Sequence, residues 1–362
     1  MSPRKRKRTG LTRYWSLGFF ALVMLVGFVV LPSMAATRFS RDEPKKETDK
    51  KEEQISKLDT ADYDRRMIAL ANYPPAATST ASTSAPQPRR PWPPAGPYPK
   101  AGAILPFKRV VAYYGNFYST KMGILGEYDE AVVIERLKAE VAKWNAADPT
   151  TPVIPAIDYI AMTAQESPGA DGYYRFRMPE EHVNRAIAMA NKVNGIAVLE
   201  VQAGLAPLQA EVESFEKYLI QPNVHLAIDP EFNMKGGEKP GTVIGTVSAG
   251  DINRASAYLA RLVQEHDLPP KLLVVHRFTQ RMVTGYESIE KRPEVQVVMV
   301  MDGWGPPAKK INTYRGFIAP EPVQFTGFKI FYKNDLKPPS DRLLTPGDLL
   351  KLTPRPSYIQ YQ

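Results

Sequence analysis

The chain has 362 residues, a formal net charge of +9 and no cysteine, so disulfides, thiolate catalysis and cysteine-ligated zinc are excluded. The excess positive charge is confined to the first 100 residues, because residues 101–362 carry 29 basic and 29 acidic side chains. The larger part of the chain therefore offers no overall attraction to a phosphate backbone, and we expect no nucleic acid among its partners.

A basic cluster followed by an apolar run predicts export. Residues 4–8 are all Lys or Arg, and residues 14–36 carry no charge. This order predicts a basic cytoplasmic tail over residues 1–13 and a membrane-inserting segment over residues 14–36. The segment could remain as a transmembrane signal-anchor, which makes a single-pass protein of the cell membrane with its C-terminal domain extracytoplasmic. Alternatively, it is a signal peptide cleaved after Ala35, which gives a secreted protein.

Residues 37–104 have the composition of a linker. Residues 41–57 mix basic and acidic side chains with almost no apolar ones, so they cannot bury enough surface to fold alone. Residues 74–99 are rich in Ser, Thr and Pro, which is typical of an extended tether. Between them, residues 55–73 have a modest apolar face and could form a short helix. We predict a disordered linker that holds the following domain away from the membrane.

From residue 105 onward, short apolar runs alternate with amphipathic stretches. The 3.6-residue period of apolar side chains predicts helices over residues 129–144, 179–193, 208–219 and 249–266. The apolar runs predict strands over residues 109–114, 153–157, 196–201, 224–228, 272–275, 295–301, 327–332 and 358–361, with residues 242–248 as the alternative fifth strand. Strands that alternate with helices indicate βαβ units and a parallel sheet.

The number of strands favours a closed barrel. Eight strands in about 250 residues match an α/β fold of the (β/α)8 or TIM barrel type, so we predict one barrel domain over residues 105–362. Residues 242–248 are then an extra element in the long loop after the fourth strand, and residues 358–361 close the sheet. A doubly wound open sheet is the main alternative, but no G-x-G-x-x-G follows the first strand. We expect the domain to be monomeric.

Carboxylates follow several of these strands, where functional residues of such barrels lie. Asp229 and Glu231 come directly after the fourth strand, and residues two apart in an extended chain point the same way. Charge at the end of a buried strand is costly unless it is used or neutralised. The same alternation predicts that Asp158, Glu200 and Asp229 face the inside of the barrel, because an apolar residue precedes each by two positions.

These side chains suit carbohydrate chemistry. Glycosidic cleavage uses one carboxylic acid to protonate the leaving oxygen and a second carboxylate to attack or stabilise the sugar. Glu231 is the candidate acid/base because it lies furthest along the chain beyond the strand, and Asp229 and Asp302 are candidates for its catalytic partner. The remaining candidates would bind substrate: Tyr113, Tyr114, Asp158, Glu200, Gln202, His276, Trp304, Tyr332 and Gln360.

The same residue types also serve structural roles. An acidic residue just past a strand often caps the next helix, which applies to Asp158 and Asp302. Polar side chains at strand ends can form a hydrogen-bonded rim, and aromatic side chains can be ordinary core. His276 could instead ligate a divalent ion together with three carboxylates, those of Asp229, Glu231 and Asp302. The first strand is not followed by the H-x-H pair usual in metal-dependent hydrolase barrels, so we expect no metal and no other cofactor.

Two motifs resemble those of the barrel lysozymes of glycoside hydrolase family 25. They are the D-x-E pair of Asp229 and Glu231, and the closing Tyr-Ile-Gln-Tyr of residues 358–361. The resemblance implies cleavage of the glycan strand of peptidoglycan, with Glu231 as the acid and an Asp as its partner. That family carries an Asp at the end of the first strand, where this chain has Tyr-Tyr-Gly at residues 113–115.

The chain as a whole resembles a group of uncharacterised exported bacterial proteins of the glycosidase-like barrel type. The resemblance rests on residues 113–115, 122–126, 229–232 and 301–307. It implies a membrane-tethered glycoside-hydrolase-like barrel that acts on a cell-wall or surface polysaccharide. A non-catalytic barrel that binds glycan or another wall component is the alternative, favoured by the missing Asp after the first strand. A metal-dependent hydrolase is the second alternative.

Overall fold

The computed structural model describes residues 57–74 and 90–362. The predicted tail, the predicted membrane segment over residues 14–36 and much of the predicted linker lie outside the described residues. Within the part of the chain that is described, no helix has the length and apolar character needed to cross a membrane.

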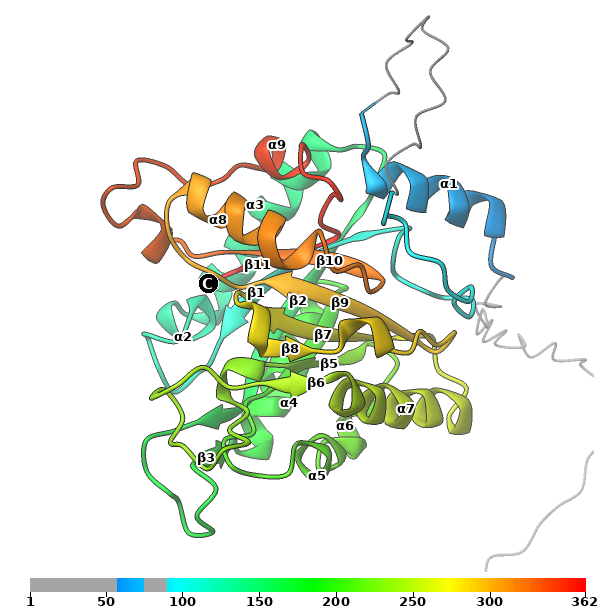
Figure 1. Ribbon diagram of the computed structural model, residues 1–362. Coiled ribbons are helices and arrows are strands. Elements are labelled where there is room, and N and C mark those ends of the chain that lie inside the picture. The colour runs from blue at the N-terminus through cyan, green and yellow to red at the C-terminus, as the bar shows by residue number, and fades with distance from the viewer. Residues whose placement is uncertain (1–56, 75–89) are drawn as a thin grey trace, which may run out of the picture. The chain divides into compact units, whose positions relative to one another are not determined.

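Eight parallel strands form a closed barrel (Figure 1). Going round the barrel, they are β1 (Arg109–Gly115), β2 (Val153–Ala164), β4 (Ile196–Val201), β5 (Val224–Ile228), β7 (Lys271–Arg277), β9 (Val295–Met301), β10 (Phe325–Ile330) and β11 (Tyr358–Tyr361). The barrel closes because β1 pairs in parallel with both β2 and β11. This confirms the predicted (β/α)8 barrel and excludes the open sheet.

Helices surround the strands (Figure 1). They are α2 (Ile124–Glu127), α3 (Glu130–Ala147), α4 (Glu180–Lys192), α5 (Leu208–Glu213), α6 (Glu216–Leu219), α7 (Ala249–Glu265), α8 (Pro307–Thr313) and α9 (Pro346–Leu349). The single helix predicted over residues 208–219 is divided into α5 and α6. At the break, Ser214 Oγ donates to the carbonyl of Glu211, a local bond that competes with helical hydrogen bonding.

Short elements lie in the loops. They are β3 (Arg175–Arg177), β6 (Val247–Ser248), β8 (Val283–Thr284), the 3-10 turns η1 (Pro230–Phe232), η2 (Gln280–Met282), η3 (Tyr286–Ser288) and η5 (Asn334–Leu336), and the π-helical turn η4 (Tyr314–Ile318). β6 pairs with β8 outside the barrel, so β7 is the fifth barrel strand and the run over residues 242–248 is not.

The second strand is longer than predicted. β2 continues seven residues beyond the expected end at residue 157, bulges between Ile160 and Met162, and then pairs antiparallel with β3. Pairing with β3 satisfies backbone groups that would otherwise be exposed beyond the barrel. Asp158 therefore lies within a strand and does not follow one.

The strands separate two apolar layers. The outer layer lies between strands and helices, while the inner layer fills the barrel with side chains such as Ala112, Val198 and Ala227. The inner cluster also contains Tyr63 and Met67, which come from a helix before the barrel. That helix therefore contributes to the barrel's interior core.

The helix is α1 (Thr60–Ala71), at the position where the sequence allowed a short helix inside the linker. Asp59 caps its first turn by accepting the backbone N–H of Asp62, at 2.9 Å. Asn72, in the left-handed conformation, ends it and donates its side-chain amide to the carbonyl of Leu352, at 2.7 Å. This part of the predicted linker therefore belongs to the folded unit.

Truncating Met67 to Ala should lower the free energy of unfolding by about 2–5 kcal/mol, the range for removing a buried methionine side chain. Met67 is 7% exposed in the inner cluster. Urea unfolding measures the change, with Ile68→Ala as the control, because Ile68 is on the same helix and 67% exposed. Equal small losses in both variants would show that α1 does not help to build the core.

Candidate active site

Each barrel strand brings one polar side chain to the inside of the barrel near its C-terminal end. In chain order they are Tyr114, Asp158, Glu200, Asp229, His276, Asp302, Lys329 and Gln360. All are buried. The residue two positions before each belongs to the inner apolar cluster in seven cases and is Gly327 in the eighth. Alternation along the strands therefore stacks this polar layer directly on the apolar interior.

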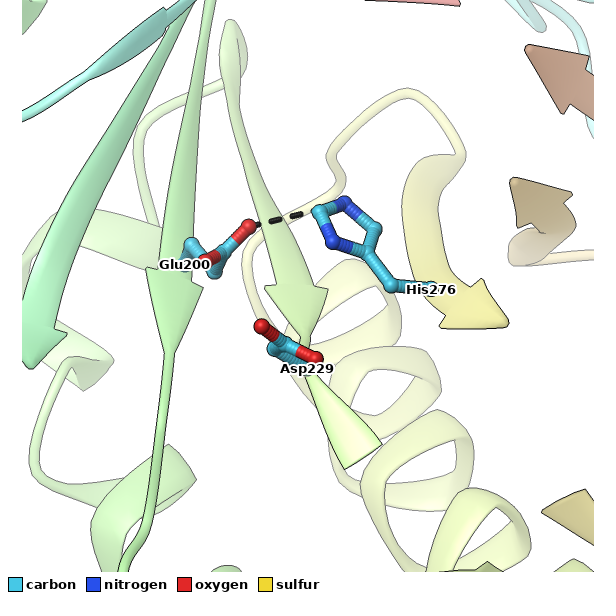
Figure 2. A group of neighbouring side chains, drawn as sticks. All are labelled: Glu200, Asp229 and His276. Atoms are coloured by element: carbon cyan, nitrogen blue, oxygen red, sulfur yellow. Dashed lines mark ion pairs between the residues drawn. The ribbon is translucent and has the colours of Figure 1, made fainter. Parts of the chain in front are cut away.

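Charges of opposite sign alternate within the layer. Glu200 Oε2 lies 3.5 Å from His276 Nε2, and His276 Nδ1 lies 2.9 Å from Asp302 Oδ2. Lys329 Nζ is 3.0 Å from the other oxygen of Asp302. Figure 2 shows Glu200 and His276 turned toward each other with Asp229 beside them. The result is a chain of ion pairs across the mouth of the barrel, in which each buried charge has a neighbour of opposite sign.

Asp302 is held as a carboxylate. Burial alone would raise its pKa, but the charges of Lys329 and His276 outweigh burial and lower the pKa to about 2. The reverse holds for His276: burial alone would lower its pKa, but Glu200 and Asp302 raise it to about 9. Near neutral pH the pair is therefore a carboxylate beside an imidazolium.

Glu231 differs from the buried acids because it is partly exposed. Burial and the nearby charge of Asp302 raise the pKa of Glu231 to about 7. A carboxyl group with such a pKa is protonated in a large share of molecules near neutral pH. It can therefore donate a proton, while ionised Asp302 cannot.

Asp229 positions Glu231. The strand ends at Ile228 and the chain turns into η1, so the strand alternation expected to carry from Asp229 to Glu231 stops there. Asp229 Oδ1 instead accepts the backbone N–H of Glu231, at 3.0 Å, and caps the turn. Burial and the charge of Glu200 raise the pKa of Asp229 well above its usual value.

A cavity of about 460 Å³ opens above the polar layer. Its lining includes Tyr114, Gln202, Asp229, Glu231, Asp302, Trp304 and Lys329. Gln202 bridges the site: its side-chain amide donates to Glu200 at 3.1 Å and its carbonyl accepts the backbone N–H of Ala164 at 3.1 Å. Trp304 is 48% exposed at the rim. The three candidate catalytic carboxylates thus share one cavity.

Hydrogen bonds connect the cavity wall to predicted residues that lie behind it. Tyr114 donates to Glu200 at 2.7 Å, and Asp158 accepts from Tyr358 at 2.6 Å and from Gln360 at 2.5 Å. Burial and Glu200 raise the pKa of Asp158 to about 7. Asp158, Glu200, His276 and Gln360 do not line the cavity, so they are placed to organise the groups that do.

Two predicted substrate-binding residues are not at the site. The hydroxyls of Tyr113 and Tyr332 lie 3.2 Å apart, and both rings pack on Tyr361 in the outer layer. Neither lines the cavity. The physical reason is alternation, because neighbours in a strand face opposite sides and only Tyr114 of the Tyr-Tyr pair points inward.

Lys329 was not among the predicted site residues. Its ammonium lies 3.8 Å from the centre of the Tyr114 ring as well as beside Asp302. The signal in the sequence was a lone lysine inside the apolar run over residues 325–332, an expensive position for a charge without a partner. It shares a strand face with Gly327, so alternation places it inside the barrel.

Capping accounts for only one of the acids. Asp229 caps η1, whereas the N-cap of α8, the helix after Asp302, is Pro306, and Asp158 lies inside β2. The capping alternative for Asp158 and Asp302 was therefore wrong.

A metal fits these residues poorly. Glu200, Asp229 and His276 offer atoms within 4.8 Å of one another, a possible ligand set among the described residues (Figure 2). A metal ion bound there would have to displace the proton of His276, whose pKa Glu200 and Asp302 raise to about 9. Lys329 already supplies positive charge to the same network. The arrangement is that of an ion-pair network.

Comparisons with known proteins give only distant likenesses. No protein-family model and no curated protein matches the chain. Among solved structures, the mannanase man26 of Bacillus subtilis is 11% identical with a TM-score of 0.37, over 70% of this chain and 80% of that one. The YdhT protein of the same organism is 14% identical with a TM-score of 0.38, over 71% of this chain and 81% of that one. A GH5 xyloglucan-specific endo-β-1,4-glucanase from a metagenomic library, in complex with cellotriose, is 10% identical with a TM-score of 0.37, over 69% and 86%.

Proposed function

We propose that the protein is an exported, membrane-tethered glycoside hydrolase that cleaves a cell-wall or surface glycan by acid/base chemistry between two carboxylates. One observation carries the proposal: Glu231, with a pKa of about 7, and Asp302, with a pKa of about 2, line the same cavity. Glycosidic cleavage needs this combination, because one carboxyl must give a proton while the other stays negative.

Each residue has its own role in the proposed reaction. Glu231 protonates the glycosidic oxygen as the bond from that oxygen to the anomeric carbon breaks. Asp302 attacks or stabilises the resulting positive sugar carbon, and water completes the hydrolysis. Lys329 and His276 hold Asp302 ionised and in place, and Asp229 fixes the turn that carries Glu231. Asp302 is thus the better-supported catalytic partner, since its pKa is lowered to about 2 while the pKa of Asp229 is raised and its carboxyl caps a turn.

A glycan-binding barrel without activity is the second candidate. Lys329 Nζ lies 3.0 and 3.2 Å from the two oxygens of Asp302, and a carboxylate paired on both oxygens is a weaker nucleophile. Release of reducing ends from a polysaccharide separates the two functions, because a binding protein retains the glycan and leaves it intact. Activity lost to a chelator and restored by a metal would instead indicate a metal-dependent hydrolase.

The rate should fall as pH rises through the pKa of Glu231, about 7. The acid form is the active one, so kcat/KM should be lower at pH 9 than at pH 6, by about tenfold per pH unit well above the pKa. Asp302 stays ionised down to about pH 2, so it sets no limit in this range. A kcat/KM that increases between pH 6 and pH 9 would show that Glu231 is not the proton donor.

A further inference from the structure

Three lysines at the mouth have no acidic partner within residues 57–74 and 90–362. Lys121 lies between β1 and α2, Lys309 is on α8, and Lys337 follows η5. All three are exposed, and none forms an ion pair with another described residue. A neighbouring lysine, Lys333, is by contrast paired with Glu127 at 2.7 Å. We call Lys121, Lys309 and Lys337 the basic rim.

The basic rim borders two adjoining cavities, which together we call the groove. A second cavity, of about 380 Å³, adjoins the cavity that contains Glu231, because the two share Lys121, Phe331 and Gln362 in their walls. Lys309 lines the first cavity and Lys337 lines the second. A chain lying through both cavities would therefore pass all three ammonium groups.

Trp304 lies close to two lysines of the basic rim. The Nζ atoms of Lys309 and Lys337 lie 5.1 and 5.2 Å from the centre of its ring. An exposed indole packs against the apolar face of a sugar ring, and an ammonium group binds a carboxylate through a charge-assisted hydrogen bond. Placed together, they match a sugar unit that has both an apolar face and a negative charge.

The acids of the site do not neutralise the rim. Asp302 is already compensated by Lys329 and His276, and Asp229 is buried in the polar layer. Glu127, in the wall of the second cavity, is paired with Lys333, and the pKa of Glu231 is raised to about 7. Unpaired lysines are common on protein surfaces, but here three of them border the cavities that hold the candidate acid. Their charge is therefore available to a ligand in the groove.

We propose that the groove takes glycans that carry carboxylates, such as uronic acid polymers, and that the basic rim determines this specificity. The inference rests on the proposed function, since it names the substrate class of the same site. Lys121, Lys309 and Lys337 contact the acidic groups of the chain, while Trp304 packs on a sugar ring between them.

Binding tests the inference without interference from cleavage. The full chain carrying Glu231→Gln is titrated with polygalacturonate, alginate and hyaluronate, each beside the same polymer with its carboxylates methyl-esterified. At least one acid polymer should bind about tenfold or more tightly than its ester, as expected for several charge-assisted contacts. The difference should shrink between about 50 mM and about 500 mM NaCl because salt screens exposed charges.

Lysine variants identify the residues responsible. Adding Lys121→Gln, Lys309→Gln and Lys337→Gln together should remove most of the preference for the acid form, a loss of about tenfold. The matched control replaces Lys108, Lys138 and Lys351, which are exposed and line neither cavity, and should keep the preference. Equal binding of every acid and its ester, or equal losses in the two triple variants, would overturn the inference.

The inference and the proposed function can fail separately. A neutral glycan that wild type cleaves, with no preference for acid polymers, would overturn the inference and leave the hydrolase standing. An acidic glycan held through the basic rim but never cleaved would support the inference and overturn the hydrolase.

Discussion

Glu231→Gln is expected to reduce kcat/KM for the cleaved glycan at least about a hundredfold, as for other losses of a general acid. The change keeps the shape of the side chain and removes its ionisable proton. Because Glu231 is partly exposed and its backbone N–H, not its side chain, is bonded to Asp229, the fold should be preserved. Steady-state hydrolysis by the two proteins measures the effect.

Glu238→Gln is the matched control for that change. Glu238 is an exposed acid in the same loop and does not line the cavity, so its replacement should leave kcat/KM unchanged. A Glu231→Gln protein that retains more than about a tenth of the activity would remove Glu231 from the role of proton donor.

Asp302→Asn is expected to cost about 3–5 kcal/mol of unfolding free energy, the usual cost of removing one partner from a buried ion pair. The change leaves two buried cations, Lys329 and His276, without their shared counter-charge. Urea unfolding at neutral pH measures the loss. Activity should disappear as well, because the negative partner of Glu231 is gone.

A double variant shows whether the stability lost in Asp302→Asn comes from leaving the charge of Lys329 unpaired. Asp302→Asn with Lys329→Met removes both members of one buried pair, so it should be more stable than Asp302→Asn alone. In wild type, the stabilisation from Asp302 should be present above about pH 4 and lost as pH falls toward about 2, because its folded pKa lies below the unfolded value. A double variant less stable than the single one would contradict the ion-pair account.

Much of the barrel could be predicted because its signals are local. Apolar runs and the 3.6-residue period located all eight strands and three of the four predicted helices as single elements. Period-two alternation also placed Asp158 and Glu200 inside the barrel, where the structure has them. The same alternation also implies that Tyr114 and Tyr113 point to opposite sides of the first strand.

The pairing of the polar layer could not be predicted, because it depends on which strand ends come together when the barrel closes. His276 and Asp302 are 26 positions apart, and Glu200 lies a further 76 positions before His276. To place Lys329 inside the barrel, the position of its strand had to be known to within one residue. Only the residues at the end of the predicted strand were considered as site candidates. Asp229 faces the barrel as predicted, but Glu231 does not continue its strand face, since a proline-led turn replaced the strand at that point.

Release of reducing ends by the wild-type protein, from peptidoglycan and from a panel of neutral and acidic bacterial and plant polysaccharides, tests the central claim most directly. The account predicts new reducing ends from at least one of these glycans, with most release from one that carries carboxylates and with less release at pH 9 than at pH 6. No release from any of them, together with retention of the protein on one glycan, would contradict it and identify a binding protein.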